Sequence, residues 1–420
     1  MVATSKTTTA QLVTDWVAGL PAPAGVLQPV QQRGRAALTT LGLPSRRQED
    51  WRLTDLARLE SLFTRALPSQ PASLARSGPV DAPDRPGDGW RIVLDGHTDP
   101  LATVSLPAGV SVLSGVELEQ ALGHTLERCS CAEAWPVEFN HALATQVLAL
   151  RIRGSVAPLE VLVTAAAGSL SATRVLLLVE EKAELEVLEV IEGAAGAAHS
   201  HVLELHLGQE ARVRHGLVAL GGGDASLLGH LAVEQEPRST YEFTSVAKGW
   251  QLGRLEPRVV QVDGRASTVL KGLVLTDADQ QFATHTAMRF EGEEGQLDQL
   301  QKSVAAGRSH SIFNGAVQVP RAAQRTDAAQ LSRNLLLSDR ARVDTKPELE
   351  IVADDVRCAH GATVTQLQED ELFYLRSRGI SAARAAALLL RGYCQEVVDL
   401  LPSMAQRWPV TDQLLEGLDS

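Results

Sequence analysis

Apolar residues near both ends of the chain recur at the three- and four-residue spacing of amphipathic helices. One such stripe predicts a helix over residues 11–20, where Pro21 follows as a helix breaker. Similar patterns predict helices over residues 30–41, 116–126 and 137–150. The N-terminal part of the chain is therefore expected to be largely helical.

Between residues 152 and 352 the helical stripes give way to short runs of alternating or β-branched residues. Leu203, Leu205 and Leu207, for example, are separated by the polar residues Glu204 and His206. Gly, Asp and Glu residues interrupt the runs, as expected for turns between strands. This part of the chain is predicted to consist of many short β-strands.

A faint repeat runs through the β region, in which a charged residue precedes an alanine. The alanines lie 211 − 183 = 28, 266 − 211 = 55 and 341 − 266 = 75 residues apart, near one, two and three times a step in the mid-twenties. Such a step over about 200 residues favours a solenoid of strands, although a pair of β-sandwiches also fits the sequence. The repeat occurs at Lys182-Ala183, Glu210-Ala211, Arg265-Ala266 and Arg340-Ala341.

Composition agrees with an interior built of aliphatic layers. The 420 residues are 44% hydrophobic but only 4% aromatic, which suits the stacked coils of a β-helix. The net charge is −12, from 51 acidic and 39 basic residues. Because such a surface repels phosphate backbones, nucleic acid is not expected as a partner.

Cysteine usage and the N-terminal residues indicate the cytoplasm. Four cysteines are too few for a disulfide framework and fit a reducing compartment. The N-terminus has no apolar segment of the kind found in secretory signals. The longest aliphatic runs, at 175–179 and 385–390, are far shorter than the about 18 residues of a membrane helix. No membrane association is expected.

The stretch from residue 356 to residue 402 carries the strongest functional signal. Cys358 and His360 lie two residues apart, so in an extended backbone their side chains leave the same face. A thiol and an imidazole in that arrangement could hold iron or zinc. The alternative is that the cysteine is a buried packing residue and that the histidine is an ordinary surface or core residue without a metal-binding role.

Two helices are predicted after this pair. Leu372 and Leu375 suggest a short helix that Gly379 ends as a C-cap. Ser381 is a candidate N-cap for a longer helix that reaches about Leu401. The longer helix has one apolar stripe, formed by Leu390, Cys394, Val397 and Leu401.

These motifs together resemble a known family. Cys-x-His-Gly-Ala-Thr at 358–363, followed by Phe-Tyr-Leu-Arg-Ser-Arg-Gly-Ile at 373–380, is similar to the C-terminal signature of the SufB/SufD family of iron–sulfur cluster assembly proteins. The short chain and its few cysteines make it more similar to SufD than to SufB. A weaker match is the Pro-x-x-Arg-x-Glu-x-Trp-x-x-Thr element at 44–54, for which we favour a capped turn that buries Trp51.

The resemblance implies a scaffold subunit of a SufBCD-type assembly complex rather than an enzyme. It implies pairing with a SufB-like subunit through the β-helix, near Cys358 and His360, and it allows a homodimer when the chain is alone. It also implies that a SufC-like ATPase docks on the C-terminal helices and supplies the ATP hydrolysis. The expected docking turn is formed by Arg376, Ser377, Arg378, Gly379 and Ile380.

The same resemblance implies that Cys358 and His360 are metal ligands near a transient iron–sulfur cluster shared with the partner subunit. No cofactor is expected to be bound tightly by this chain alone. No catalytic residue is expected either, and Gly221-Gly222-Gly223 is not a phosphate loop because no Lys-Ser/Thr pair follows it.

Other residues capable of chemistry give weaker signals. Cys129 and Cys131 form a Cys-x-Cys pair with no further ligand in view. Four histidines cluster in the β region, and we interpret them as solvated strand-face residues rather than metal ligands; they are His199, His201, His206 and His215.

Two other functions remain open on sequence alone. Acidic residues of the β region could be compared with the acid pairs of β-helix polysaccharide lyases or hydrolases, and the chain could also be a purely structural β-solenoid. The residues in question are Asp277, Asp279, Glu291 and Glu293.

The predicted fold is mainly β, with a right-handed parallel β-helix core flanked by N-terminal and C-terminal helical domains. Pro, Ser, Gly and Asp residues accumulate over 67–89 and mark a linker. The expected divisions are 1–89 for the N-terminal helical domain and linker, 90–355 for the β-helix with a preceding mixed segment, and 356–420 for the C-terminal helical domain.

Overall fold

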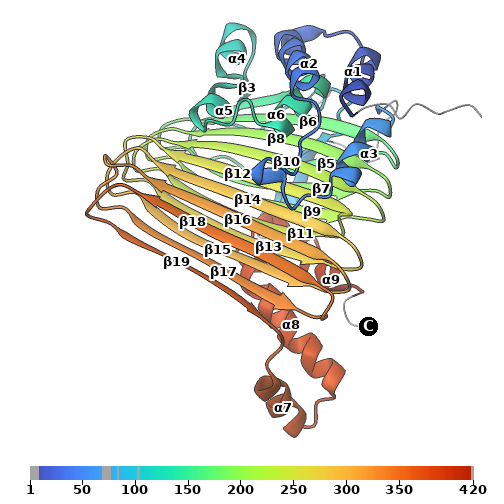
Figure 1. Ribbon diagram of the computed structural model, residues 1–420. Coiled ribbons are helices and arrows are strands. Elements are labelled where there is room, and N and C mark those ends of the chain that lie inside the picture. The colour runs from blue at the N-terminus through green and yellow to red at the C-terminus, as the bar shows by residue number, and fades with distance from the viewer. Residues whose placement is uncertain (1–8, 69–76, 83–84, 102–104, 418–420) are drawn as a thin grey trace, which may run out of the picture.

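A computed structural model describes residues 9–68, 77–82, 85–101 and 105–417 of the chain. Helices lie at both ends of the described chain, and a β-solenoid lies between them (Figure 1). The helices before and beside the first coils are α1 (Thr9–Gly19), η1 (Gly25–Leu27), α2 (Gln28–Leu41), η2 (Glu49–Trp51), α3 (Leu56–Ser61), η3 (Leu62–Thr64), α4 (Gly115–Ala121), α5 (His124–Arg128) and α6 (Trp135–Leu143).

Two sheets face each other along the solenoid. Within the described residues, the ten-stranded sheet has the order β1-β2-β5-β7-β9-β11-β13-β15-β17-β19. Its strands are β1 (Gly78–Ala82), β2 (Arg85–Leu94), β5 (Leu159–Ala165), β7 (Glu184–Gly193), β9 (Arg212–Gly221), β11 (Thr240–Lys248), β13 (Ser267–Thr276), β15 (Gln296–Ala305), β17 (Asp327–Leu336) and β19 (Arg357–Thr365).

The nine-stranded sheet, again within the described residues, has the order β18-β16-β14-β12-β10-β8-β6-β4-β3. Its strands are β3 (Val110–Val112), β4 (Leu148–Ile152), β6 (Leu170–Val179), β8 (Ala198–Leu207), β10 (Ser226–Gln235), β12 (Leu252–Gln261), β14 (Gln281–Phe290), β16 (His310–Val319) and β18 (Arg342–Ile351). The chain alternates between the two sheets, and successive strands of one sheet pair in parallel. The parallel β-helix expected from the sequence is confirmed.

The repeat seen in the sequence marks one corner of each coil. At this corner a residue with a left-handed backbone precedes a small buried residue, as at Lys182 (φ 58°) before Ala183 and Glu210 (φ 61°) before Ala211. The corner recurs at intervals from 265 − 238 = 27 to 325 − 294 = 31 residues. The left-handed residues are Lys182, Glu210, Arg238, Arg265, Glu294 and Arg325.

The assignment of Arg340-Ala341 to this repeat is wrong. Ala341 lies in the turn between β17 and β18, at the opposite corner of the coil, where its N–H bonds to the carbonyl of Ser338. The 75-residue interval is therefore not a multiple of the repeat, and one coil takes about 28 residues rather than about 25.

Both faces of the sheets are covered, which explains why the strand alternation is faint in the sequence. Along β7, Val187 faces the apolar interior of the solenoid, whereas Leu188 and Val190 face outward. The outward residues of the ten-stranded sheet pack under the C-terminal helices, on side chains such as Leu390 and Val397. The nine-stranded sheet packs under the N-terminal helices.

The C-terminal helices are α7 (Glu369–Ser377), α8 (Ala382–Val398), η4 (Ser403–Arg407) and α9 (Val410–Leu415). The sequence located α7 and α8 correctly: Gly379 (φ 85°) follows α7, and the Ser381 hydroxyl accepts the N–H of Arg384 at the start of α8. The buried ammonium of Lys302 holds α8 to the sheet by donating to the Tyr393 carbonyl at 2.7 Å and the Glu396 carboxylate at 2.5 Å.

The two ends of the solenoid differ. At the N-terminal end, β1 and β3 pair antiparallel with β2 and β4 and complete the two sheets beside the helices. At the C-terminal end, β18 and β19 are the last strands of their sheets among the described residues, and most of their side chains are exposed. We call this end the open end. Over the described ranges, no helix combines the length and apolar character needed to cross a bilayer.

Some predicted elements have different bounds. The helix expected over 137–150 is α6, which ends at Leu143, followed by β4, because Leu148, Leu150 and Ile152 alternate into the solenoid interior. The helix expected over 116–126 is divided into α4 and α5. The expected linker falls partly on residues 69–76 and 83–84, outside the described residues, and its described parts contribute to β1 and β2.

The predicted domain divisions do not coincide with the ends of the solenoid. The division at residue 90 falls inside β2, and the one at residue 356 precedes β19. Since β19 pairs with β17 along its whole length, residues 357–365 belong to the solenoid rather than to the helical segment. The division of the chain into three separate domains stays a prediction.

Candidate functional site at the open end of the solenoid

Strand β19 carries both predicted ligands, Cys358 and His360. Its register places Cys358 beside Ala328 and His360 beside Gln330 of β17, all on the face that looks into the solenoid. Because β19 is the last strand, no further coil covers this face within the described residues. Cys358 is half-buried against the apolar interior, whereas His360 is exposed. The two side chains therefore share a face, as the spacing predicted.

The thiol of Cys358 favours its protonated form. Burial raises the pKa of Cys358, a hydrogen bond with the backbone of Ala328 opposes the rise, and the nearby carboxylate of Asp327 adds to it. Since the thiolate is the form that binds metals, a raised pKa makes Cys358 a less ready metal ligand near neutral pH. A neutral imidazole needs no such deprotonation.

The interior beneath β19 is polar. The Ser332 hydroxyl oxygen accepts hydrogen bonds from the Thr345 hydroxyl at 2.9 Å and from the Asn334 amide nitrogen at 3.0 Å. Gln299 and Gln330, on neighbouring strands, are also buried here and hydrogen-bonded to each other. The last coils therefore offer a hydrophilic floor next to the candidate ligands.

The predicted docking turn comprises the last two residues of α7 and the first three of the link to α8. Arg376, Ser377, Arg378 and Gly379 are exposed, and the N–H of Ile380 closes the turn on the Leu375 carbonyl at 3.3 Å. The adjoining helix α7 has no buried residue. Two of its aromatic side chains are largely exposed: Phe373 by 71% and Tyr374 by 58%.

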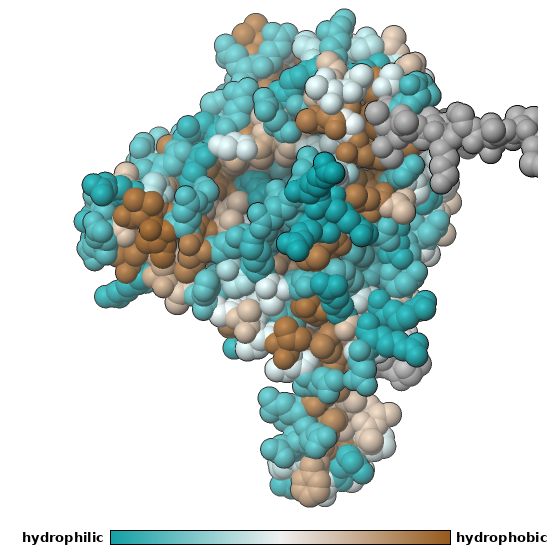
Figure 2. All heavy atoms as spheres, in the orientation of Figure 1, coloured by the Kyte–Doolittle hydropathy of each residue, from teal (hydrophilic) through white to brown (hydrophobic). Residues whose placement is uncertain are grey.

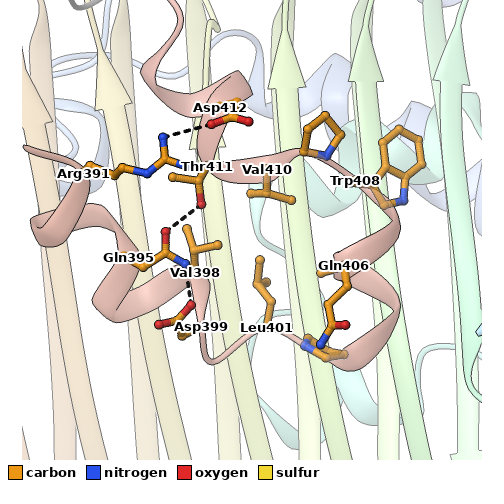
Figure 3. Close-up of a pocket in the computed structure, with 13 residues that line it drawn as sticks. Arg391, Gln395, Val398, Asp399, Leu401, Gln406, Trp408, Val410, Thr411 and Asp412 are labelled. Carbon is orange, nitrogen blue, oxygen red and sulfur yellow. Dashed lines mark hydrogen bonds and ion pairs between the residues drawn. The ribbon is translucent and has the colours of Figure 1, made fainter. Parts of the chain in front are cut away.

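The α7–α8 unit projects from the body of the molecule (Figure 1) and exposes hydrophobic residues (Figure 2). A pocket of about 350 Å³ lies farther along α8, between this helix and α9 (Figure 3). Two contacts tie the helices together across it: Arg391 pairs with Asp412 at 3.0 Å, and the Thr411 hydroxyl donates to Gln395 at 3.0 Å. No motif in the sequence indicated this pocket.

The interpretation of the histidine cluster as solvated is wrong for three of its four members. His199, His201 and His215 are buried, and only His206 reaches the surface. The sequence could not reveal this, because the partner that holds His201 and His215 lies on a different strand. Glu189 accepts hydrogen bonds from His201 Nε2 at 2.9 Å and from His215 Nε2 at 3.0 Å.

This buried network extends to both sheets. His201 Nδ1 lies 2.8 Å from the Thr173 hydroxyl, and His215 Nδ1 lies 3.0 Å from the Tyr241 hydroxyl. Burial alone would raise the pKa of Glu189, but the hydrogen bonds and charges of the two histidines outweigh it and hold that pKa below its ordinary value. The network is thus an ionic cluster in the core of the solenoid.

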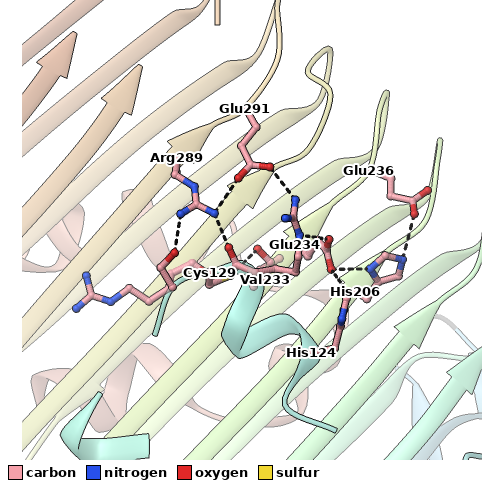
Figure 4. Close-up of polar contacts among 11 residues, drawn as sticks. His124, Cys129, His206, Val233, Glu234, Glu236, Arg289 and Glu291 are labelled. Atoms are coloured by element: carbon pink, nitrogen blue, oxygen red, sulfur yellow. Dashed lines mark hydrogen bonds and ion pairs between the residues drawn. The ribbon is translucent and has the colours of Figure 1, made fainter. Parts of the chain in front are cut away.

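Cys129 and Cys131 lie at the end of α5, on the outer face of the nine-stranded sheet. Ser130 (φ 55°) and the bond from Cys131 N–H to the Leu126 carbonyl form a helix C-cap. Arg128 beside them pairs with Glu234 at 3.0 Å and Glu291 at 2.7 Å, in the polar cluster of Figure 4. Throughout the described ranges, no three His, Cys, Asp or Glu side chains are placed to hold a metal ion.

The acidic residues compared with glycosidase acids form two pairs at opposite ends of β14. Asp277 and Asp279 precede β14, whereas Glu291 and Glu293 follow it. A ten-residue strand separates the pairs by about 30 Å, far more than the about 5–10 Å between two glycosidic carboxylates. Ion pairs also occupy three of them: Asp279 with Arg58, Glu291 with Arg128 and Glu293 with Arg325.

The triple glycine makes room for an indole ring. A side chain at Gly221 would come within 2.7 Å of the Trp250 ring, and one at Gly193 in the neighbouring coil within 2.6 Å. The element around Trp51 is likewise structural: Trp51 is buried, and the guanidinium of Arg254 lies 4.0 Å from its ring centre.

Comparisons with known proteins agree with these features. Residues 162–393 match the model of the SufBD core domain of the SUF system for FeS cluster assembly. A SufBD family iron–sulfur cluster assembly protein of Synechocystis sp. is 30% identical over 401 residues, which cover 89% of this chain and 87% of that protein. The iron–sulfur cluster assembly protein SufD of Escherichia coli is 26% identical over 423 residues, covering 92% and 95%. The chloroplastic protein ABCI7 of Arabidopsis thaliana is 35% identical over 234 residues, covering 55% and 49%.

Proposed function

The chain belongs to the SufBD family of iron–sulfur cluster assembly proteins and is SufD-like, and from this we propose that it is a non-catalytic scaffold subunit of a SufBCD-type complex. It pairs with a SufB-like subunit at the open end, docks a SufC-like ATPase on α7 and α8, and contributes ligands to a nascent cluster. The observation that carries the proposal is the position of Cys358 and His360 on the inner face of the last strand.

Two strand edges that have no partner among the described residues support pairing at the open end. An exposed edge presents backbone donors and acceptors that favour the addition of further strands. Here β18 and β19 present such edges side by side, and apolar side chains accompany them: Ile351, Val352 and Val364 are at least 40% exposed. A partner with the same fold could continue both sheets at once, either a SufB-like chain or, for the chain alone, a second copy.

We expect Val364→Lys to weaken binding to the SufB-like subunit by at least about tenfold, or about 1.4 kcal/mol. The substitution places a charge on a 46% exposed apolar side chain of β19, where the partner would desolvate it. Titration of the partner by isothermal calorimetry measures the effect. The control is Val112→Lys on β3, whose side chain is 50% exposed at the other end of the solenoid. Equal affinities for the two variants would contradict pairing at the open end.

Exposed aromatic residues on α7 support the docking of the ATPase. The docking turn begins in the last residues of α7, a helix that buries none of its own residues; the turn is formed by Arg376, Ser377, Arg378, Gly379 and Ile380. Aromatic and arginine side chains are the residue types that most often dominate binding energy at interfaces. ATP hydrolysis then belongs to the partner.

Replacing Phe373 and Tyr374 together by serine should lower ATPase binding by about 30-fold, the effect of losing about 2 kcal/mol of hot-spot contacts. Point substitutions are preferable to removal of the C-terminal helices, because α8 covers apolar residues of the ten-stranded sheet. Val116→Ser on α4, where the side chain is 67% exposed, is the control. Unchanged retention of the ATPase in a pull-down by the double variant would exclude α7 as the docking site.

The cluster is cargo of the assembly rather than a resident cofactor. We propose that His360 is the main ligand from this chain, because its imidazole is exposed and can bind iron as the neutral base. Cys358 is a second and weaker ligand, held largely as the thiol by its raised pKa. The remaining ligands come from the SufB-like subunit, so the cluster is transient and shared. The cytoplasm remains the proposed location.

A further inference from the structure

One buried polar atom at the open end has no hydrogen-bond partner that would explain its position. The side chain of Gln330 on β17 is 2% exposed, and its Oε1 is a buried acceptor with no partner. A buried acceptor left unsatisfied costs about 1–3 kcal/mol. Such an atom needs a donor, which a water, an ion or a side chain that turns toward it in another state of the protein can supply.

Gln330 is the end of a chain of side-chain amides inside the solenoid. Its Nε2 donates to Gln299 Oε1 at 2.9 Å, and Gln299 Nε2 donates to the Thr286 hydroxyl at 2.7 Å. Gly315 leaves the space for this arrangement, because a side chain there would come within 2.4 Å of Gln330 Nε2. The carboxamide of Gln330 is therefore fixed at its nitrogen, and its oxygen is the free end of the chain.

The register places His360 beside Gln330 on the neighbouring strand. Gln299, Gln330 and His360 occupy one column across β15, β17 and β19, on the interior face of the sheet. Neighbouring strands lie about 4.8 Å apart. The amide nitrogen of Gln330 is used by Gln299 of β15, so its oxygen is the atom left to accept from a donor on β19. His360 is exposed and makes no hydrogen bond among the described residues, which leaves its ring free to turn inward.

We propose that Gln330 is a positioning residue for His360: its Oε1 accepts one ring N–H and leaves the lone pair of the other ring nitrogen for the metal. A histidine ligand almost always donates its second nitrogen to an acceptor, which fixes the tautomer and the orientation of the ring. The amide chain from Thr286 through Gln299 holds that acceptor in place. This inference rests on the proposed role of His360 and assigns it the acceptor that the sequence motif does not contain.

The test compares Gln330→Met, which keeps the length but removes the acceptor, with Gln330→Glu, which keeps an acceptor. Glutamate can be accommodated if the Gln299 amide flips. Its nitrogen then donates to the new carboxylate, and its oxygen accepts from the Thr286 hydroxyl. Gln301→Met is the matched control, since Gln301 is a buried glutamine of β15 in the column of Ser332 and Ala362 rather than that of His360.

The first readout is the tautomer of the His360 ring in the complete complex with the SufB-like subunit. Long-range ¹H–¹⁵N spectra measure it at a pH where the ring is neutral. The His360 signals are assigned as those that are lost in His360→Ala. One tautomer should dominate in the wild type, in Gln330→Glu and in Gln301→Met, and both should be present in Gln330→Met. An unchanged tautomer ratio in Gln330→Met would overturn the inference.

The second readout is cluster yield on the same complexes after anaerobic reconstitution. Gln330→Met should reduce it by about tenfold, Gln330→Glu should restore it, and Gln330→Met should add nothing in a His360→Ala background. A tautomer change without any effect of His360→Ala on yield would refute the proposed ligand role and leave the hydrogen bond standing. Loss of yield in His360→Ala with an unchanged tautomer in Gln330→Met would refute the positioning role alone.

Discussion

Glu189→Ala is expected to lower the free energy of unfolding by about 3–5 kcal/mol, the usual cost of removing one partner from a buried ion pair. Glu189 is fully buried between His201 and His215 and accepts a hydrogen bond from each. Without the carboxylate, two ring N–H groups inside the solenoid lose their acceptor. Urea unfolding followed by tryptophan fluorescence measures the change.

Glu184→Ala is the matched control on the same strand. Glu184 is exposed and lies 3.7 Å from Arg212, so its loss should change the free energy of unfolding by less than about 1 kcal/mol. The Glu189 contribution should also depend on pH. Since the pKa of Glu189 is lowered in the folded state, its stabilisation is complete above the unfolded pKa and is lost as the pH falls below it. Equal effects of the two substitutions would show that the buried network does not stabilise the solenoid.

The features that could be predicted from the sequence are those set by local chemistry. Gly379 and Ser381 located the boundary between α7 and α8, because helix caps depend on a single residue type in a fixed place. The corner repeat favoured a β-helix but left a pair of β-sandwiches open, and the family resemblance decided between them; in the structure each corner has a left-handed residue followed by a small buried one. The two-residue spacing of Cys358 and His360 was enough to place both on one face of a strand.

The features that could not be predicted depend on contacts between distant segments. Leu148 and Leu150 fit a helix or a strand equally well, and only the neighbouring strand β6 decides in favour of β4. His201 and His215 look like surface residues until Glu189 of another strand is placed between them. The acceptor for His360 is hidden for the same reason, because Gln330 is 30 residues away in sequence and adjacent only through the strand register.

His360→Ala should reduce the cluster content of the assembled complex by at least about tenfold, the scale of loss when even an outer partner of a metal ligand is removed. The substitution should leave assembly intact, because the exposed imidazole makes no hydrogen bond to the described chain. Cys358→Ala should have a smaller effect, since burial raises the pKa of that thiol and keeps it from acting as a thiolate. The two variants together therefore rank the two ligands.

The most direct measurement is the iron and sulfide content of the complex with the SufB-like subunit and the SufC-like ATPase after anaerobic reconstitution, alongside size-exclusion chromatography of the same sample. The account predicts that the His360→Ala complex elutes like the wild type and holds about one tenth of its iron and sulfide or less. A His360→Ala complex that elutes normally and carries the wild-type content would contradict the placement of the nascent cluster at the open end of this chain.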